Sequence, residues 1–427
     1  MTFASYREIF ALGSFRRFWL AFTFSVFGDA MTRVALIWFV YDTTGSARDV
    51  GWLLLFYTGP VVVGGLLAGM LLDRFSRDAV MAVDNLVRGF AVALVPILHA
   101  TGRLAVWHVY VVAAVYGLLM MISLAGGPSL VPDLVPAEHL ATANALEMLS
   151  FTLGGVVGPP LAGILIGVIG APNVVVIDAL SYLAFAAALV SIRQKRTPDE
   201  AIPSTRAATR YTLGDAFRLM RRNPVLLSTT LMFMTFNIGN GLVSVALPVL
   251  PDRVLHGGPG LYGILLGILA TGEIVSATIA GRVALRWPLG SAICAAQALS
   301  GLSLLLVTGR SVWLVGLGLA LFGACSSPLT IWAQTLRMRI IPERLRGRTF
   351  ALLRTMMQGG GPLGGALGGV LLPLLGIPAM IVLAAAVVGL PGLIGSRVGE
   401  LRRDEVGDRS ADDVGLPSFL ASPAEDP

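Results

Sequence analysis

The sequence predicts an all-α membrane protein with twelve transmembrane helices, arranged as two six-helix bundles related by a pseudo-two-fold axis along the membrane normal. Three observations carry this prediction. Of the 427 residues, 55% are hydrophobic and only 13% are charged, whereas a soluble domain carries roughly 25% charged residues. The apolar residues fall in long stretches that can cross a hydrocarbon core of about 30 Å as helices. Landmarks of the first half recur in the second half.

The apolar stretches are helical spans, because lipid offers backbone groups no hydrogen-bonding partner. They cover residues 18–41, 49–72, 79–100, 105–127, 141–168, 172–192, 224–250, 259–281, 289–308, 311–336, 348–371 and 374–396. We expect an N-terminal bundle over 1–192, a cytoplasmic linker with an interfacial helix over 193–223, a C-terminal bundle over 224–396 and a disordered cytoplasmic tail over 397–427.

The basic residues indicate how the chain lies in the membrane. If the N-terminus is inside, 24 of the 31 Lys and Arg lie in inside segments and four lie in outside loops. This excess predicts a multi-pass protein of the inner (plasma) membrane with both termini cytoplasmic. The net charge of +6 does not indicate a nucleic-acid partner, because the basic residues form short clusters between apolar runs.

Several classes of protein are disfavoured by what the sequence lacks. Cys294 and Cys325 lie inside apolar stretches and the four histidines are scattered, so we predict neither a disulfide framework nor a metal site. No phosphate-binding loop and no paired catalytic constellation is present. We therefore expect no cofactor and no enzymatic activity.

An internal repeat supports the division into two bundles. Ser5–Glu8 precedes the first span and Thr212–Asp215 precedes the seventh, 207 residues later, each with a capping pattern. Both are predicted to begin helices that lie on the membrane surface. Gly51 and Gly263 open the second and eighth spans. Six plus six helices in parallel repeat is the plan of transporters that rock two halves around a site near the midplane.

The loop between the second and third spans carries a recognisable signature. Residues 69–78 read GMLLDRFSRD and resemble the Gly-x-Leu-x-Asp-Arg-x-Gly-Arg-Lys motif of the major facilitator superfamily, from which Ser76 and Asp78 depart. The resemblance implies a latch between the halves in the outward-facing state, with Arg346 and Arg348 as candidate partners. If the resemblance is set aside, residues 69–78 are an ordinary charged loop. Gly69 permits close helix approach, and Asp73 can accept hydrogen bonds from a helix N-terminus. The predicted latch residues are Gly69, Asp73, Arg74 and Arg77.

The fifth span is similar to the antiporter signature Gly-x-x-x-Gly-Pro-x-x-Gly-Gly, with Ala162 in place of one glycine. The resemblance implies export, whereas helix packing alone would leave the direction of transport open. Residues 359–365 echo the motif in the eleventh span. The motif residues are Gly154, Gly158, Pro159 and Gly163.

A closer resemblance covers most of the first half. Residues 28–46, 84–89, 144–146 and 178–182 are similar to the drug:proton antiporter group that includes macrolide efflux proteins and the enterobactin exporter. Many drug antiporters have an arginine in the fourth span that is implicated in proton transfer. This chain has none there, which weakens a coupling mechanism copied from that group.

Charged residues inside spans need a physical reason, because each costs on the order of 3 kcal/mol at the bilayer centre. Asp29 lies near the middle of the first span with Arg33 four residues on, and Glu273 lies alone midway along the eighth. Asp29 and Arg33 form either a neutralising intrahelical pair or, with Glu273, a proton or substrate site. We take Asp29, Arg33 and Glu273 as the candidates for proton coupling.

The other intramembrane charges have less decisive positions. Asp84 and Arg88 have the spacing of a structural pair. Glu147 and Arg354 are candidates for gate or cavity contacts, and Asp178 is a charge partner or a helix cap. Methionine and aromatic side chains suit a bulky, variable ligand, although packing is the alternative for each. The candidates for the substrate cavity are Tyr57, Tyr116, Met120, Trp332, Met357 and Gln358.

Together these features predict a secondary active efflux transporter that exports a hydrophobic or amphipathic small molecule, such as a drug, antibiotic or siderophore-like natural product, by proton antiport and alternating access. The alternatives are an uptake carrier or uniporter for a small metabolite and a non-transporting membrane sensor or assembly partner. We expect a monomer whose partners are the small-molecule substrate, a proton and the lipid bilayer.

Overall fold

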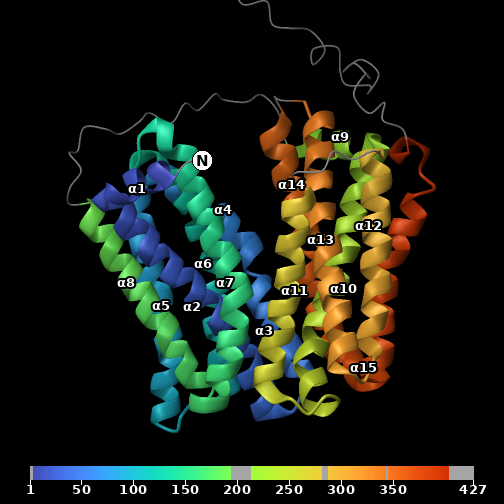
Figure 1. Cartoon of the computed structure of the whole chain (residues 1–427), viewed down its shortest axis with the longest axis horizontal. Coiled ribbons are helices and arrows are strands. Elements are labelled where there is room, and N and C mark those ends of the chain that lie inside the picture. The colour runs from blue at the N-terminus through green and yellow to red at the C-terminus, as the bar shows by residue number, and fades with distance from the viewer. Residues whose placement is uncertain (1–2, 194–212, 281–286, 343–344, 403–427) are drawn as a thin grey trace, which may run out of the picture.

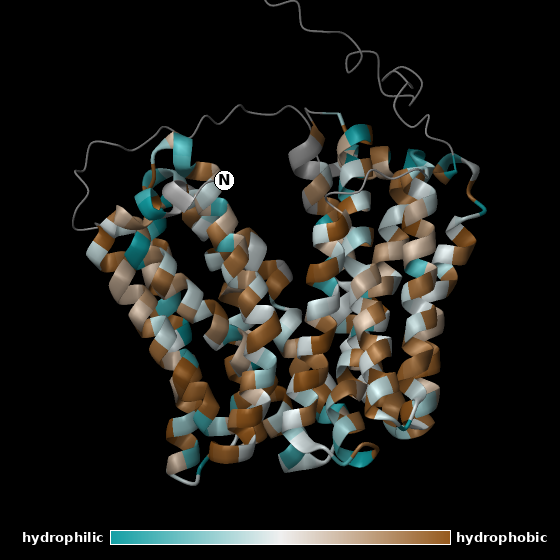
Figure 2. Cartoon of the chain, in the orientation of Figure 1, coloured by the Kyte–Doolittle hydropathy of each residue, from teal (hydrophilic) through white to brown (hydrophobic). Residues whose placement is uncertain are grey.

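All secondary structure in the described residues, 3–193, 213–280, 287–342 and 345–402, is helical in the computed structural model of the chain. Figure 2 shows hydrophobic residues along most of the length of the helices and hydrophilic residues mainly near their ends. Helices that are apolar on nearly all sides are typical of membrane spans. The predicted all-α membrane class is confirmed.

Each half of the chain forms one group of helices (Figure 1). The N-terminal bundle contains α1 (Phe3–Ala11), α2 (Gly13–Thr44), α3 (Ala47–Thr58), α4 (Val61–Arg74), α5 (Arg77–Ala100), α6 (Val106–Leu130), α7 (Leu140–Ile169) and α8 (Ala171–Arg193). The C-terminal bundle contains α9 (Leu213–Arg222), α10 (Pro224–Arg253), α11 (Gly258–Ala280), α12 (Leu289–Leu304), α13 (Val312–Ile340), α14 (Arg346–Gln358) and α15 (Gly360–Gly395). Short 3₁₀ turns are η1 (Val131–Asp133), η2 (Ala137–His139), η3 (Leu305–Thr308) and η5 (Gly399–Leu401).

The helices account for the twelve predicted spans. Among the described residues, eleven helical stretches are long and apolar enough to cross a membrane, and the last runs over 44 residues, Leu352–Gly395. Gly376, at φ +76° and ψ 167°, breaks this stretch into two helices, since only glycine adopts such a conformation readily. One crossing needs roughly 20 residues, so the stretch supplies the eleventh and twelfth spans.

The two bundles repeat one packing pattern, which confirms the predicted parallel repeat. In the N-terminal bundle α2 packs on α7, α4 on α6 and α5 on α8. At the equivalent positions of the C-terminal bundle α10 packs on α15, α11 on α13 and α12 on α15. The contacts between the bundles follow the same symmetry, because α3 packs on α15 and α11 packs on α7. The ribbons meet at the end where α3 begins and stand apart at the end that carries α1 and α9 (Figure 1).

The two short helices that precede the first span of each half pack against their own bundle. Ile9 of α1 is fully buried and α1 packs on α2 and α7. Leu219 and Met220 of α9 are buried and α9 packs on α10 and α14. Each short helix therefore buries apolar side chains against the bundle that follows it. Thr212, with the linker 194–212 and the tail 403–427, lies outside the described residues.

Candidate functional site

Glycines form the contact between the two bundles. A Cβ atom added to Gly51 of α3 would lie 2.7 Å from the carbonyl oxygen of Gly365 on α15. A Cβ atom added to Gly263 of α11 would overlap the carbonyl oxygen of Pro159 on α7 and lie 3.1 Å from the Cα of Gly163. Backbones can approach this closely only where side chains are missing. Gly51 and Gly263, which mark the repeat in sequence, thus make equivalent contacts in space.

The antiporter-like motif of α7 serves two interfaces. A Cβ at Gly154 would lie 2.7 Å from Val26 Cγ1, and one at Gly158 would lie 2.7 Å from the Cβ of Ala30, both on α2. These glycines therefore hold α7 against α2 within its own bundle. Pro159 and Gly163, further along α7, reach the other bundle. The close helix approach expected of this motif is present.

The echo of the motif in α15 divides in the same way. A Cβ at Gly364 would overlap the backbone of Ile238 on α10, within the C-terminal bundle, whereas Gly365 and Gly369 face α3 of the other bundle. The two copies thus occupy equivalent positions, each at a junction between an intrabundle and an interbundle contact.

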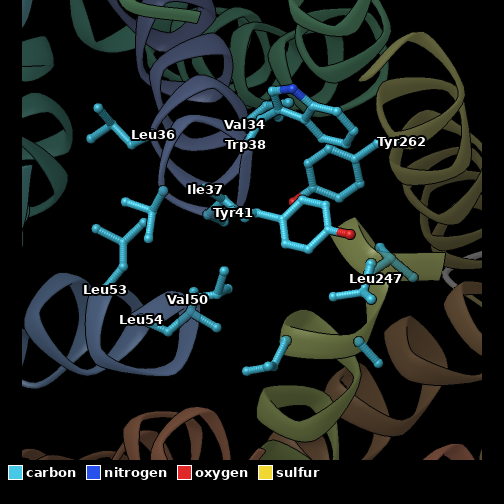
Figure 3. Close-up of a cluster of buried hydrophobic side chains, with 14 of the residues drawn as sticks. Val34, Leu36, Ile37, Trp38, Tyr41, Val50, Leu53, Leu54, Leu247 and Tyr262 are labelled. Atoms are coloured by element: carbon cyan, nitrogen blue, oxygen red, sulfur yellow. The ribbon is translucent and has the colours of Figure 1, made fainter. Parts of the chain in front are cut away.

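A clasp of polar and aromatic side chains closes the same end of the molecule. The Tyr41 hydroxyl of α2 donates a 2.8 Å hydrogen bond to Asp252 Oδ2 of α10. Nearby, the rings of Trp38 on α2 and Tyr262 on α11 stack with their centroids 6.0 Å apart (Figure 3). Arg253 Nη2 also donates a 3.0 Å hydrogen bond to a backbone carbonyl of the opposite bundle. Both bundles contribute to each contact, so the clasp has to break if this end opens.

A network of buried polar side chains lies inside the N-terminal bundle. Arg88 of α5 is only 2% exposed and forms a bidentate pair with Asp84, at 3.0 Å from Nε to Oδ1 and 2.5 Å from Nη2 to Oδ2. Arg88 Nη1 donates at 3.0 Å to the Tyr182 hydroxyl of α8. That hydroxyl donates in turn to Asp29 Oδ1 of α2. The predicted Asp84–Arg88 pair is present, and the network joins three helices.

Asp29 and Arg33 do not form the intrahelical pair that one interpretation of the sequence predicts. Asp29 turns toward α8, where Tyr182 is its partner. Arg33 is exposed, and its guanidinium carbon lies 6.0 Å from the centroid of the Tyr57 ring. Among the described residues, Arg33 has no acidic partner within 4.0 Å. A charged side chain exposed in mid-span is stable only where water reaches it.

Glu273 belongs to the interior of the C-terminal bundle. It is half-buried on α11, and the Ser326 hydroxyl of α13 donates a 3.2 Å hydrogen bond to Glu273 Oε1. The sequence predicts a lone carboxylate without a cation on its own helix. The structure places a single hydroxyl, rather than a cation, beside it.

The structure places two other predicted acids of the N-terminal bundle in buried positions. Glu147 is 4% exposed and lies against Gly127 of α6 in its own bundle, whereas Arg354, the other candidate for a gate or cavity contact, is exposed. Asp178 is not a helix cap, since it is the eighth residue of α8 and fully buried. Its neighbour Ser181 donates a 3.1 Å hydrogen bond to Asp178 Oδ1.

The predicted latch does not join the bundles through the described side chains. Arg77 Nη1 donates a 2.6 Å hydrogen bond to the Ser129 carbonyl oxygen and lies 3.9 Å from Asp133, both in its own bundle. Gly69 is exposed and has no atom within 4 Å of an added Cβ, and Arg74 is exposed. The side chains of Asp73, Arg346 and Arg348 lie outside the described residues.

The structure brings some of the predicted cavity residues together. Tyr57 and Tyr116 stack with centroids 4.7 Å apart. Tyr116 and Met120 line a cavity of about 120 Å³ together with Asp29 and Arg88. The remaining candidates lie in the other bundle, where Trp332 and Met357 pack against its apolar core and Gln358 is exposed.

Sequence reasoning missed the residues that connect these acids. Tyr182 and Ser123 are hydrogen-bonded to the network, and Ser123 Oγ donates to Asp84 Oδ2 at 2.7 Å. The available signal was spacing, because Tyr182 lies four residues after Asp178 and hence on the same side of α8. Arg337, placed in a loop by the sequence, is buried in α13, with its guanidinium carbon 4.8 Å from the centroid of the Phe233 ring.

A comparison with known protein families shows to which family the chain belongs. A family profile described as transmembrane secretion effector matches residues 4–418. The chain belongs to this family of major facilitator transporters. The family and the relatives described next are transporters rather than enzymes.

The transporter resembles efflux proteins along most of its length. It is 26% identical to the multidrug efflux pump Tap of Mycolicibacterium fortuitum over 86% of this chain and 93% of the relative. It is also 26% identical to the enterobactin exporter EntS of Salmonella typhimurium over 91% of this chain and 93% of the relative.

Solved structures share its fold. The nucleoside transporter NupG superposes with a TM-score of 0.71 at 12% identity, covering 90% of this chain and 98% of that one. A bacterial homologue of the iron transporter ferroportin, solved in an inward-facing state, superposes with a TM-score of 0.67 at 17% identity, covering 90% of this chain and 99% of that one.

Proposed function

We propose that this transporter exports a hydrophobic or amphipathic small molecule from the cytoplasm in exchange for protons. The single observation that carries the proposal is the position of Asp29. It lies in mid-span beside a small cavity, and its described hydrogen-bond partner is a tyrosine rather than a cation. A carboxylate in that environment can be neutral or charged at modest energetic difference, which is what a proton carrier requires. The similarity to Tap and EntS supports export over uptake.

The two ends of the molecule have different roles in this proposal. The excess of basic residues assigns the end with α1 and α9 to the cytoplasm. The glycine contacts and the Tyr41–Asp252 clasp then close the outer end. In this proposal the conformation is closed to the outside, and the ribbons of the two bundles stand apart at the cytoplasmic end (Figure 1), from which the substrate enters. Release outside requires that the outer contacts break and the latch region closes.

Proton exchange supplies the direction of transport. In the inner-open conformation a substrate that binds near Tyr57, Tyr116 and Met120 competes with protonation of Asp29. A proton can shift the balance between the two conformations only through a difference in its affinity for them. Burial of Asp29 in one conformation and exposure to water in the other provides that difference.

The proposal is tested by drug efflux from cells. The full chain is expressed in an efflux-deficient bacterial host, and the accumulation of ethidium and the susceptibility to a panel of antibiotics are measured with and without a protonophore. We expect lower ethidium accumulation that the protonophore abolishes, and loss of this effect in Asp29→Asn and Glu273→Gln. Asp42→Asn, at an exposed acid of the same α2 helix, is the matched control. Full export by both variants would show that these acids do not carry the proton.

A further inference from the structure

Asp178 lies in the driest part of the N-terminal bundle. It is fully buried between α8 and α2, where it faces Gly28. A Cβ atom at Gly28 would overlap the Asp178 carboxylate and lie 2.7 Å from Ser181 Oγ. The backbone of α2 therefore packs directly against the carboxyl group and leaves no room for water around it.

The hydrogen bonds around Asp178 leave two oxygen atoms without a partner. Ser181 Oγ donates to Asp178 Oδ1 at 3.1 Å, but Oδ2 has no hydrogen-bond partner. The Thr32 hydroxyl of α2, also fully buried, likewise has no partner. A buried oxygen without a partner is costly, because it has lost its bonds to water.

The charged and titratable groups that face Asp178 do not neutralise it. Asp29 on α2 carries a charge of the same sign, and Tyr182 on α8 already donates to Asp29. Arg88 on α5 is committed to Asp84 and Tyr182. Within the described part of the chain Asp178 forms no ion pair. An ionised carboxylate without a partner in so dry a site is strongly destabilising.

We propose that Asp178 carries a proton on Oδ2, the carboxyl oxygen without a partner, so that Asp178 and Asp29 form a two-carboxyl proton site across the α2–α8 contact. The proton removes the uncompensated charge from the buried carboxyl group. A metal cation would need a larger cage of oxygen ligands than one carboxyl group and two hydroxyls. Asp29 lies at the cavity and Asp178 lies behind it, so that Asp29 exchanges protons with water and Asp178 stores one.

This inference rests on the proposed proton exchange for its role in transport, but the protonation itself can be measured without substrate. The full chain is purified into lipid nanodiscs, and infrared difference spectra are recorded between acidic and alkaline buffers. We expect a carbonyl stretching band of a buried carboxylic acid that Asp178→Asn removes. Asp42→Asn should leave it unchanged.

Transport measurements distinguish a failure of this inference from a failure of the proposed function. In proteoliposomes Asp178→Asn should keep ethidium exchange without a gradient and lose most of the uptake driven by a pH gradient. A wild-type spectrum without the band, or a band that Asp178→Asn leaves unchanged, would overturn the assignment even where transport is proton-driven. Equal gradient-driven uptake by wild type and Asp178→Asn would overturn the role of Asp178 in coupling. Wild-type uptake that no pH gradient drives would instead refute the proposed function and leave the spectral assignment standing.

Discussion

The Tyr182 hydroxyl donates a hydrogen bond to Asp29 Oδ1 and thereby ties the middle of α2 to α8. The same hydroxyl accepts a hydrogen bond from Arg88 Nη1 at 3.0 Å. Tyr182 therefore connects the proposed proton carrier to the buried ion pair of α5. A change in the charge of Asp29 is felt at Arg88 through this one oxygen atom, because buried hydrogen-bonded groups polarise one another.

Removal of this hydroxyl should weaken the N-terminal bundle. Tyr182→Phe keeps the ring, whose centroid lies 4.6 Å from the Arg88 guanidinium carbon, but leaves Asp29 and Arg88 each short of a partner. We expect a loss of about 1–3 kcal/mol in stability, seen as a lower unfolding temperature in detergent. Tyr110→Phe removes a hydroxyl that donates at 3.3 Å to the Asp49 carbonyl and carboxylate oxygens and to no ion pair among the described residues, and it serves as the control. Equal unfolding temperatures for the two variants would contradict the role given to Tyr182.

The Asp84–Arg88 pair should be strongly coupled. Arg88→Met leaves the Asp84 carboxylate buried without its cation, and we expect a loss of about 3–5 kcal/mol. Adding Asp84→Asn to the same chain should recover much of that loss, because no uncompensated charge then remains. Thermal unfolding of both single variants and the double variant gives the coupling energy. Losses that simply add would argue against a buried pair.

The sequence predicts the spans well and the site only in part. Hydropathy locates all twelve spans to within a few residues, because the bilayer fixes the length and composition of each helix. Mid-span position also identifies Asp29, but spacing along one helix selects Arg33 as its partner. The actual partner, Tyr182, is 153 residues away in sequence, and only the packing of α2 on α8 brings it near. The periodicity of the sequence does not reveal which side chains pair across helices, because that pairing depends on how the helices pack.

The contact of the two bundles should not tolerate a side chain at Gly51 or Gly263. Gly51→Ala or Gly263→Ala places a Cβ against backbone of the opposite bundle, and we expect the closed outer end to be destabilised by about 1–3 kcal/mol. The exposure of that end can be followed by labelling a cysteine introduced at Ser46, in a chain without its native cysteines. Gly155→Ala, at a glycine of α7 with no neighbour within 4 Å, should not change the labelling. Equal labelling for all three variants would show that the glycines do not set closure.

A reversible cross-link between positions 41 and 252 should hold this end of the molecule closed. Cys294 and Cys325 are first replaced by serine, and Tyr41→Cys and Asp252→Cys are then combined. The Tyr41 hydroxyl reaches Asp252 across the length of its ring, so the two cysteines lie too far apart for a direct disulfide. A bifunctional methanethiosulfonate reagent that spans the length of a tyrosine side chain should cross-link them, block ethidium efflux and be reversed by a reducing agent. Each single cysteine variant is the control. Undiminished efflux by the cross-linked protein would mean that the outer end does not open during transport.

The most direct test of the account is the movement of protons on substrate addition. The purified chain is reconstituted into liposomes that contain a pH-sensitive dye, and ethidium is added under a substrate gradient with no other driving force. We expect a proton flux opposite to the flux of ethidium in the wild-type protein and none in Asp29→Asn. A wild-type protein that carries ethidium without moving protons, or an Asp29→Asn variant that moves them equally well, would contradict it.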